Sequence, residues 1–393
     1  MYKSIKIEGF RQFDNFEIDD LGAVNLFLGQ NNTGKSSILE AFYTHACGLN
    51  FNNFNKKIIN GRRFNPPNSP IDAGNQIRSL FYSTETPPYK FDISIIREGK
   101  YGGNDRIEDI NYKYEYIFEP SSFMSSIFDP RSEGYLDASF LENHKEATDT
   151  FLGSFEIKSF CKTLPRMSGL YSEMNKKTTL PYYYPNLSIK SKHSNFHTAI
   201  FHNILDHRYE DKDLAIFSHL KRYDIFKDFI IEIKEAFPII KDIDYIPYFE
   251  GAKAPLLITI NNGKKLPLYT FGDGLRRWYH ILGNMIIFQN AIHCIEEIDS
   301  TFHPESQHKL APLLLKYSKK YNNQIMLTSH SLEFADAFLS SLYKEDKNEL
   351  IEKGDDPVRV FTLEKDKNDK IGLWKRTDKE AFKLRSKYNL EIR

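Results

Sequence analysis

Apolar positions along the chain follow two spacings, and the spacing changes from segment to segment. Short runs that are apolar throughout, or that alternate with polar residues, predict β-strands, whereas apolar residues at every third or fourth position predict helices. The strand pattern occurs over residues 2–8, 16–18, 24–28, 89–97, 111–118, 256–260, 265–269, 291–295, 324–328, 358–364 and 370–376. The helix pattern occurs over residues 37–43, 195–206, 225–237, 275–289, 306–321 and 332–342. Strands that alternate with helices indicate an α/β protein.

The middle of the chain lacks this alternation. Residues 119–245 begin irregularly, with several prolines and a glycine, and become helical only later. We interpret them as a mainly helical insertion that divides one domain into an N-terminal part, residues 1–118, and a C-terminal part, residues 246–393. Within the first part, residues 50–75 are rich in Asn, Pro and Gly and are predicted to form a loop.

The segment that follows the third predicted strand fits the phosphate-binding pattern G-x-x-x-x-G-K-S. Glycines allow the backbone to approach phosphate oxygens closely, and the N–H groups at the start of the next helix face the anion. The candidate nucleotide-binding residues are Gly29, Asn31, Asn32, Thr33, Gly34, Lys35, Ser36 and Ser37. Lys35 is predicted to reach the β- and γ-phosphates of ATP, where it would assist catalysis, and Ser36 to bind Mg²⁺.

A second buried strand, residues 291–295, ends in two carboxylates, Glu296 and Glu297. This is the arrangement of a Walker B motif, in which the first acid holds Mg²⁺ and the next one orients or activates the attacking water. We therefore assign metal binding to Glu296 and catalysis to Glu297. The acid on the metal side is usually Asp, and Glu296 is longer by one methylene, so we expect turnover to be slow.

Two further elements suit the same site. His330 follows the predicted strand at 324–328, and the carboxyl ends of parallel strands face the ligand crevice. Its imidazole is therefore placed to contact the γ-phosphate or the attacking water. Gly272, Asp273 and Gly274 form a glycine-rich turn at the start of a helix, where backbone N–H groups can bind the γ-phosphate of a nucleotide held by a second subunit.

Composition argues against several classes of function and assigns none. The 53 Lys and Arg residues balance 53 Asp and Glu residues, so net charge gives no argument for binding DNA. The three cysteines contain no C-x-x-C pair, which argues against a zinc site and a disulfide framework. The chain has no signal-peptide pattern and no apolar run of about 18 residues, so we expect a cytoplasmic protein without a membrane partner.

In this order, the elements resemble those of ABC-type ATPases of the SMC, RecF and OLD group, and most of all the AAA15 subset. The resemblance rests on residues 9–13 (GFRQF), 29–37 (GQNNTGKSS), 272–277 (GDGLRR), 295–304 (IEEIDSTFHP) and 328–331 (TSHS). It implies a P-loop ATPase head, in which a mixed sheet flanked by helices is joined to an antiparallel β lobe. Two departures are Gly272 in place of the signature serine and Glu296 in place of Asp.

The resemblance also implies partners and ligands. Such ATPases dimerise head-to-tail and hold two ATP molecules, each between one phosphate loop and the other subunit's signature loop. It therefore implies ATP and Mg²⁺ as ligands and a homodimer or higher homo-oligomer. It also implies that Arg11 lies near the nucleotide.

Sixty-three residues follow His330. The TOPRIM nuclease domain of OLD proteins needs about 100 residues, so we expect no nuclease in this chain. A stand-alone AAA15 ATPase of this size is typical of bacterial anti-phage systems, where it works with a separate effector. The chain resembles the ATPase subunits of PARIS-type defence, which hold a toxic effector nuclease until a phage protein triggers its release. ATPases of retron and Septu-like systems fit as well. The alternatives are a RecF-like repair ATPase that binds DNA directly, and a structural subunit that binds ATP without turnover.

Overall fold

The structure is a computed structural model that describes most of the chain. The described residues are 1–59, 69–83, 86–100, 107–122, 125, 150–164, 176–184, 197–246, 254–302, 304–343, 357–388 and 390–392. They form two compact units. The first contains residues Met1–Leu21 and Ser36–Ala199, and the second contains Gly22–Lys35 and Ile200–Arg393.

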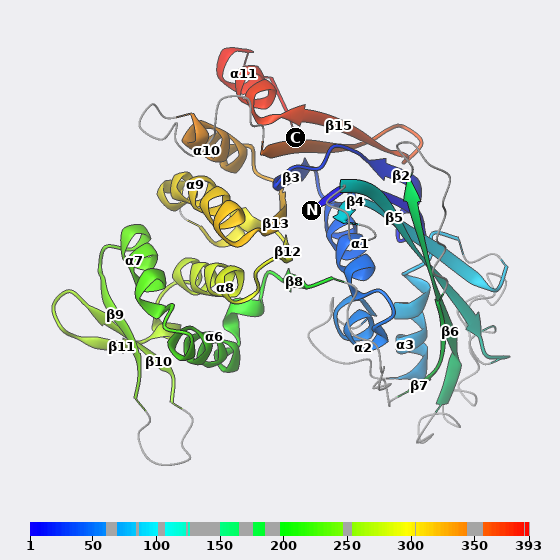
Figure 1. The fold of residues 1–393 in the computed structure, drawn as a ribbon, viewed down its shortest axis with the longest axis horizontal. Coiled ribbons are helices and arrows are strands. Elements are labelled where there is room, and N and C mark those ends of the chain that lie inside the picture. The colour runs from blue at the N-terminus through cyan, green and yellow to red at the C-terminus, as the bar shows by residue number, and fades with distance from the viewer. Residues whose placement is uncertain are drawn as a thin grey trace. The chain divides into compact units, whose positions relative to one another are not determined.

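The first unit is built on a six-stranded antiparallel sheet (Figure 1). Its strands, in spatial order, are β2 (Phe13–Ile18), β1 (Tyr2–Phe10), β4 (Tyr89–Lys100), β5 (Ile107–Pro120), β6 (Thr150–Leu164) and β7 (Lys176–Tyr184). The predicted hairpin of residues 89–97 and 111–118 is confirmed, with Ile93 opposite Tyr114. Residues 2–8 and 16–18 also form strands, joined by a tight turn at Arg11 and Gln12.

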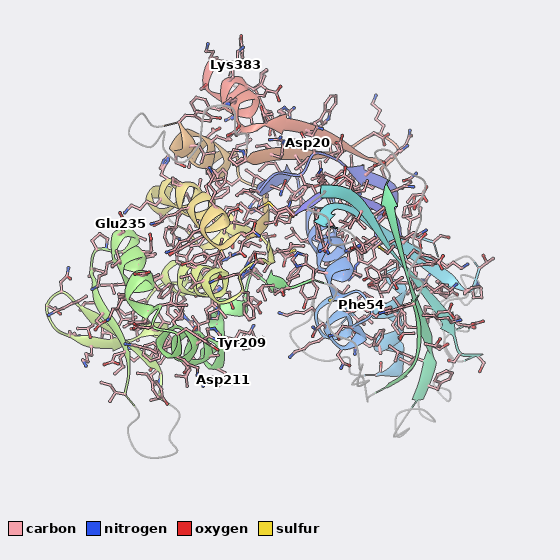
Figure 2. The ribbon with its side chains drawn as sticks, viewed as in Figure 1. Asp20, Phe54, Tyr209, Asp211, Glu235 and Lys383 are labelled. Carbon is pink, nitrogen blue, oxygen red and sulfur yellow. The ribbon has the colours of Figure 1, made fainter. Side chains whose placement is uncertain are left out.

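Aromatic side chains fill the core of this unit. The rings of Phe91 and Tyr116 stack with centroids 4.6 Å apart, and Phe54, which Figure 2 labels, lies 5.2 Å from Tyr116. Phe118 and Phe155 continue the cluster at 4.7 Å. The high aromatic content of the chain thus has a packing role here, because each buried ring removes a large apolar area from water.

Helices pack on this sheet where the sequence predicted a loop. The described part of residues 50–75 holds α2 (Phe51–Phe54), a π-helical turn (Asn55–Ile59) and the start of α3 (Pro70–Arg78), all C-terminal to α1 (Lys35–Cys47). The prediction was wrong there because the Asn and Pro residues act as helix starts. The Ser69 side chain accepts a hydrogen bond from the Asp72 N–H, and Pro70 occupies the first helical position, where its missing N–H costs nothing.

The second unit contains the mixed sheet expected of the α/β head. Its strands, in spatial order, are β15 (Ile371–Thr377), β14 (Val358–Lys365), β3 (Val24–Gly29), β13 (Gln324–Ser329), β12 (Ile292–Ile295) and β8 (Ala199–His202). β14, β3, β13 and β12 run parallel, whereas β15 is antiparallel to β14. Strands β3, β12 and β13 are buried along their whole length, as the continuous apolar runs predicted.

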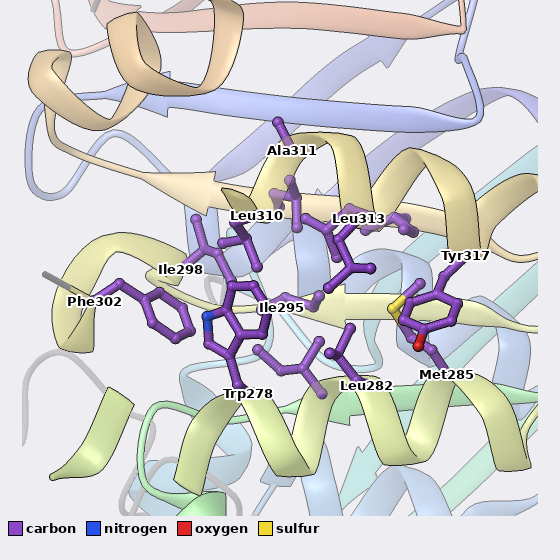
Figure 3. Packing of buried hydrophobic residues seen from close by; sticks show 14 of the residues in the cluster. Trp278, Leu282, Met285, Ile295, Ile298, Phe302, Leu310, Ala311, Leu313 and Tyr317 are labelled. Carbon is purple, nitrogen blue, oxygen red and sulfur yellow. The ribbon is translucent and has the colours of Figure 1, made fainter. Parts of the chain in front are cut away.

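Four helices accompany this sheet: α8 (Asp273–Ile287), α9 (Pro304–Tyr321), α10 (Leu332–Leu342) and α11 (Asp378–Tyr388). The first three lie side by side (Figure 1). Figure 3 shows Trp278 of α8 facing Phe302, Ile298 and Leu310 in the buried cluster. The Trp278 ring meets Phe302 and Phe237 edge-on, at 6.1 and 5.6 Å between centroids.

The described part of residues 119–245 is less helical than predicted. It contains α6 (Glu210–Arg222), where Figure 2 labels Asp211, and α7 (Phe226–Ala236), but also β6, β7, β8 and β9 (Ile240–Tyr245). Strand β8 occupies part of the helix expected at 195–206. β9 joins β10 (Leu256–Ile260) and β11 (Lys265–Pro267) in a small antiparallel sheet. The strands predicted at 256–260 and 265–269 are confirmed as β10 and β11, which pair with each other, whereas β6, β7, β8 and β9 were not predicted. Among the described residues, no helix is long and apolar enough to cross a membrane.

The two tryptophans provide a test of the packing. Trp278 is 1% exposed and Trp374 is 57% exposed. We expect Trp278→Ala to lower the free energy of unfolding by about 3–5 kcal/mol, because it leaves a large cavity beside Phe302. Trp374→Ala is the control and should change it by less than about 1 kcal/mol. Urea unfolding followed by circular dichroism measures both, and equal effects would contradict the described core.

Candidate active site

The phosphate loop connects β3 to α1 through a backbone that requires glycine. Gly29 has φ +152° and Gly34 has φ +97°, both in the region that favours glycine. A Cβ atom on Gly29 would lie 2.6 Å from the Leu363 carbonyl oxygen and 2.7 Å from Thr33 Oγ1. The Thr33 hydroxyl itself donates to the Gln30 carbonyl at 2.8 Å. The two glycines therefore serve the conformation of the loop, as the motif predicted.

The remaining loop residues divide by exposure. Asn31 and Asn32 are exposed, and Asn32 adopts a positive φ of 63°. Ser36 is half-buried and Ser37 is buried, both in the first turn of α1. This first turn supplies backbone N–H groups without helical partners, which is the feature that binds phosphate. The contact of these residues with nucleotide, and of Ser36 with Mg²⁺, remains a prediction.

Lys35 is a buried cation at the end of the loop, 8% exposed. Its Nζ donates to the carbonyl oxygens of Gly29 and Gln30, each at 2.7 Å. Burial lowers the pKa of Lys35, while the charges of Glu297 and Asp299 act in the opposite direction. The carboxylates of Glu297 and Asp299 thus stabilise the charged form of Lys35. The negative charge of a bound phosphate would stabilise that form further.

The two Walker B glutamates follow β12 directly, as predicted. The Glu296 N–H donates to the His202 carbonyl at 3.1 Å. Glu297 has φ +43°, a left-handed conformation that costs a residue with a side chain about 1–2 kcal/mol. Two hydrogen bonds hold it there: its N–H donates to Thr328 Oγ1 at 2.9 Å, and its carbonyl accepts from the Ser300 N–H at 3.1 Å. Backbone strain of this kind is often found at functional positions.

Asp299 is the residue of this site that sequence reasoning did not assign. Its side chain is 6% exposed, and Oδ2 lies 3.4 Å from His330 Nδ1. Its Oδ1 is buried without a hydrogen bond from any described residue. Asp299 thus pairs with the imidazole of His330, and its charge also raises the pKa of Lys35. The sequence signal was present, because Asp299 comes two residues after Glu297, but only the 3₁₀ turn (Ile298–Thr301) brings it back into the site.

His330 comes directly after β13 and before Ser331, the N-cap of α10. Its side chain is half exposed, at 48%, and its imidazole is paired with Asp299. The structure therefore brings Lys35, Glu297, Asp299 and His330 together at the carboxyl ends of neighbouring parallel strands, where α/β proteins bind ligands. His330's contact with a γ-phosphate remains a prediction.

The glycine-rich turn opens α8 with Gly272 as N-cap. Nothing lies within 4 Å of a Cβ built on Gly272, so the backbone there is open on that side. Asp273 is held instead by its own unit: Arg208 Nη2 lies 2.6 Å away, and His207 Nε2 3.3 Å away. Burial raises the pKa of Asp273, but these two groups outweigh it and the net pKa is lowered. Its carboxylate therefore anchors the turn, which leaves backbone N–H groups for binding.

Arg11 has extensive partners within the first unit. Its Nε donates to Glu40 at 2.9 Å, and its other nitrogens donate to Ser79 Oγ at 2.5 Å and to the Ile58 carbonyl at 3.1 Å. The Arg11 and Glu40 side chains are 6% and 4% exposed. The guanidinium thus joins the β1–β2 turn to α1 and to the end of α3. Its predicted role beside the nucleotide remains a prediction.

Mg²⁺ fits the donors that this chain offers. Mg²⁺ favours hard oxygen ligands and usually takes one or two from the protein and the rest from substrate phosphates and water. Among the described residues, no group of three or more His, Cys, Asp and Glu side chains could hold a metal. The unbonded Oδ1 of Asp299 and the buried Oγ1 of Thr301 add oxygens beside the Walker B strand. The assignment of Ser36 and Glu296 as the residues that would hold the ion remains a prediction.

Comparisons with known proteins identify the family of this chain. The family profile of the AAA ATPase domain AAA_15 matches residues 1–200 and 184–335. An ATP/GTP phosphatase of Helicobacter pylori (strain ATCC 700392 / 26695) is 21% identical over 361 residues, which cover 85% of this chain and 86% of that protein.

Solved structures agree with the fold. The chain is similar to an SMC head crystallised with the C-terminal winged-helix domain of ScpA, with a TM-score of 0.51 and 11% identity over 97% of this chain and 99% of that one. The SMC head domain from Thermotoga maritima aligns with 12% identity over 95% of this chain and 98% of that one, with a TM-score of 0.41 that is too low to support a shared fold. The similarity to the first structure confirms the predicted fold class and nothing beyond it.

Lys35 provides the direct test of the site. We expect Lys35→Ala to weaken ATP binding by at least about 100-fold, or about 2.8 kcal/mol, because charge-assisted contacts to phosphate are lost. Lys316→Ala is the control, since Lys316 pairs with Glu232 on α7. Titration with a fluorescent ATP analogue measures both affinities. Unchanged affinity in Lys35→Ala would refute the assignment of the phosphate loop.

Proposed function

The chain belongs to the AAA_15 family of AAA ATPase domains, and from this premise we propose that it binds ATP and hydrolyses it slowly in order to control a separate effector protein. The observation that carries the proposal is that buried Lys35, Glu297 and the Asp299–His330 pair all follow the carboxyl ends of neighbouring parallel strands. A phosphate-binding cation beside a water-orienting carboxylate is the arrangement that phosphoanhydride hydrolysis requires.

Each residue of the site has a distinct part in this proposal. Lys35 neutralises charge that develops on the γ-phosphate, and Glu297 orients the attacking water and accepts its proton. His330, fixed by Asp299, contacts the γ-phosphate and thereby reports its presence. Ser36 and Glu296 hold Mg²⁺, which supplies further neutralisation of phosphate charge. The longer side chain of Glu296 in the position of an Asp is the reason for slow turnover.

A second copy of the chain completes the site in this proposal. The open backbone at Gly272 and the anchored Asp273 leave the N-terminus of α8 available for an anion. In a head-to-tail dimer this turn would bind the γ-phosphate held by the other subunit, so ATP would join two subunits. A homodimer is thus the smallest active assembly, and higher homo-oligomers follow if a further surface is shared.

The effector is proposed to be a toxic nuclease of bacterial anti-phage defence, released when a phage protein acts as trigger. The family resemblance to AriA, the ATPase subunit of PARIS-type systems, suggests this role. One observation supports a separate effector, because the similar SMC head is bound to a domain of another protein.

Glu297→Gln provides the test, because it should trap ATP. We expect kcat to fall by about 100-fold or more while ATP affinity is retained, since a general base contributes 10²–10⁴-fold. Glu333→Gln, an exposed acid in the first turn of α10, is the control and should keep full activity. Single-turnover hydrolysis of labelled ATP measures both, and equal kcat values would exclude Glu297 as the catalytic base.

The Glu297→Gln variant also distinguishes effector control from direct DNA binding. The trapped protein is co-expressed with its neighbouring genes, purified with ATP and Mg²⁺, and weighed by native mass spectrometry. A stoichiometric protein partner on a symmetric oligomer would support effector control. A dimer that carries only nucleic acid would contradict it and favour the RecF-like alternative. A wild-type protein that binds ATP without turnover would favour the structural-subunit alternative.

A further inference from the structure

Arg277 is a buried arginine that the proposed catalytic roles do not use. It lies one turn after the start of α8 and is 2% exposed. Its Nη1 donates to Ser300 Oγ at 2.6 Å, and its Nη2 donates to the carbonyl oxygen of Glu296. A planar guanidinium that donates to two acceptors fixes their relative position better than a single hydrogen bond does.

The two acceptors stand on either side of Glu297 in the sequence. Glu296 directly follows the buried strand β12, and Ser300 belongs to the 3₁₀ turn after it. Ser300 is bound twice, since its N–H donates to the Glu297 carbonyl while its hydroxyl accepts from Arg277. Arg277 therefore holds the segments on both sides of Glu297, the residue with the left-handed backbone.

The charges around Arg277 explain why it remains a cation when buried. Burial lowers its pKa to about 10, and the charges of Asp299, Glu296 and Glu297 oppose that effect. The guanidinium is therefore protonated at neutral pH. Its removal would leave the Glu296 carbonyl without this donor and the three carboxylates without one of their buried counter-charges.

Arg277 shares a rigid element with the glycine-rich turn. Gly272 caps α8 and Gly274 lies in its first turn, where a Cβ on Gly274 would meet the Thr301 carbonyl at 3.0 Å. Trp278, the next residue after Arg277, packs against Phe302 just beyond the 3₁₀ turn. The start of α8 and the segment after Glu297 are thus in close contact, and a shift of one displaces the other.

We propose that Arg277 is a positioning residue that couples the Gly272–Gly274 turn to the placement of Glu297 in the same chain. The inference rests on the proposed function and deepens it. When the turn engages the γ-phosphate of a nucleotide held by a second copy, α8 carries Arg277 with it and fixes the Glu296–Ser300 segment in its hydrolytic geometry. Hydrolysis at one site then depends on nucleotide at the other, which gives positive cooperativity in ATP.

The test compares three variants: Arg277→Lys, Ser300→Ala and the control Arg385→Lys. Lysine keeps the charge but cannot donate in the fork geometry, and Ser300→Ala removes one of the two contacts. Arg385 pairs with Asp336 through two hydrogen bonds of 2.6 Å, so Arg385→Lys also removes a two-point guanidinium contact, but outside the site. Three quantities are measured for each: ATP dissociation constant, kcat, and the Hill coefficient of ATPase activity.

We expect Arg277→Lys to bind ATP within about threefold of wild type while kcat falls about 10–100-fold, as small misplacements of a catalytic group do. Its Hill coefficient should fall towards 1. Ser300→Ala should show the same changes to a smaller extent, and Arg385→Lys neither change. Thermal midpoints of the three variants should be similar, which separates positioning from a loss of folding.

Two results would overturn the coupling. One is a kcat and Hill coefficient that are unchanged in both Arg277→Lys and Ser300→Ala. The other is a loss of activity that follows the thermal midpoint in all three variants. If Arg277→Lys does not fold, Ser300→Ala alone decides, by the same criteria. Failure of the proposed function has a different signature, because then wild type and Arg385→Lys also hydrolyse no ATP.

Discussion

The parallel pairing of β3, β13 and β12 is the constraint on which the candidate site depends. Parallel strands end at the same edge of a sheet, so the three segments that follow them meet there although they are up to 300 residues apart. Lys35 follows β3, Glu297 follows β12, and His330 follows β13. Because all three strands are buried along their length, a register shift would expose apolar residues, and the edge is thereby fixed.

Buried charge then determines how these residues act together. Two cations, Lys35 and Arg277, and the carboxylates of Glu297 and Asp299 lie in one poorly hydrated region, where electrostatic interactions are stronger than in water. Burial lowers the pKa of both cations, and the nearby carboxylates oppose this shift. The charged groups of the site are thus already in place before a nucleotide binds. Such preorganisation allows the protein to stabilise charge in the transition state without rearranging its own groups.

Much of the architecture follows from the family and the fold. Membership of AAA_15 and the SMC-head fold account for the phosphate loop, the Walker B strand and the mixed sheet. The family profile also covers residues 1–200, so the antiparallel sheet that contains β4, β5, β6 and β7 lies within the matched part of the chain.

The sequence by itself determined the elements whose signals are local. The phosphate loop, Glu296, Glu297 and the turn at Gly272 were predicted because spacing within about ten residues defines them. Only the tertiary structure decided what burial and long-range pairing control. It placed Asp299 beside His330, bound Arg277 to Ser300, tied Arg11 to Glu40, and made strands of β6, β7 and β8. These contacts join residues whose separation in sequence carries no information about their distance in space, because the packing of the whole unit sets it.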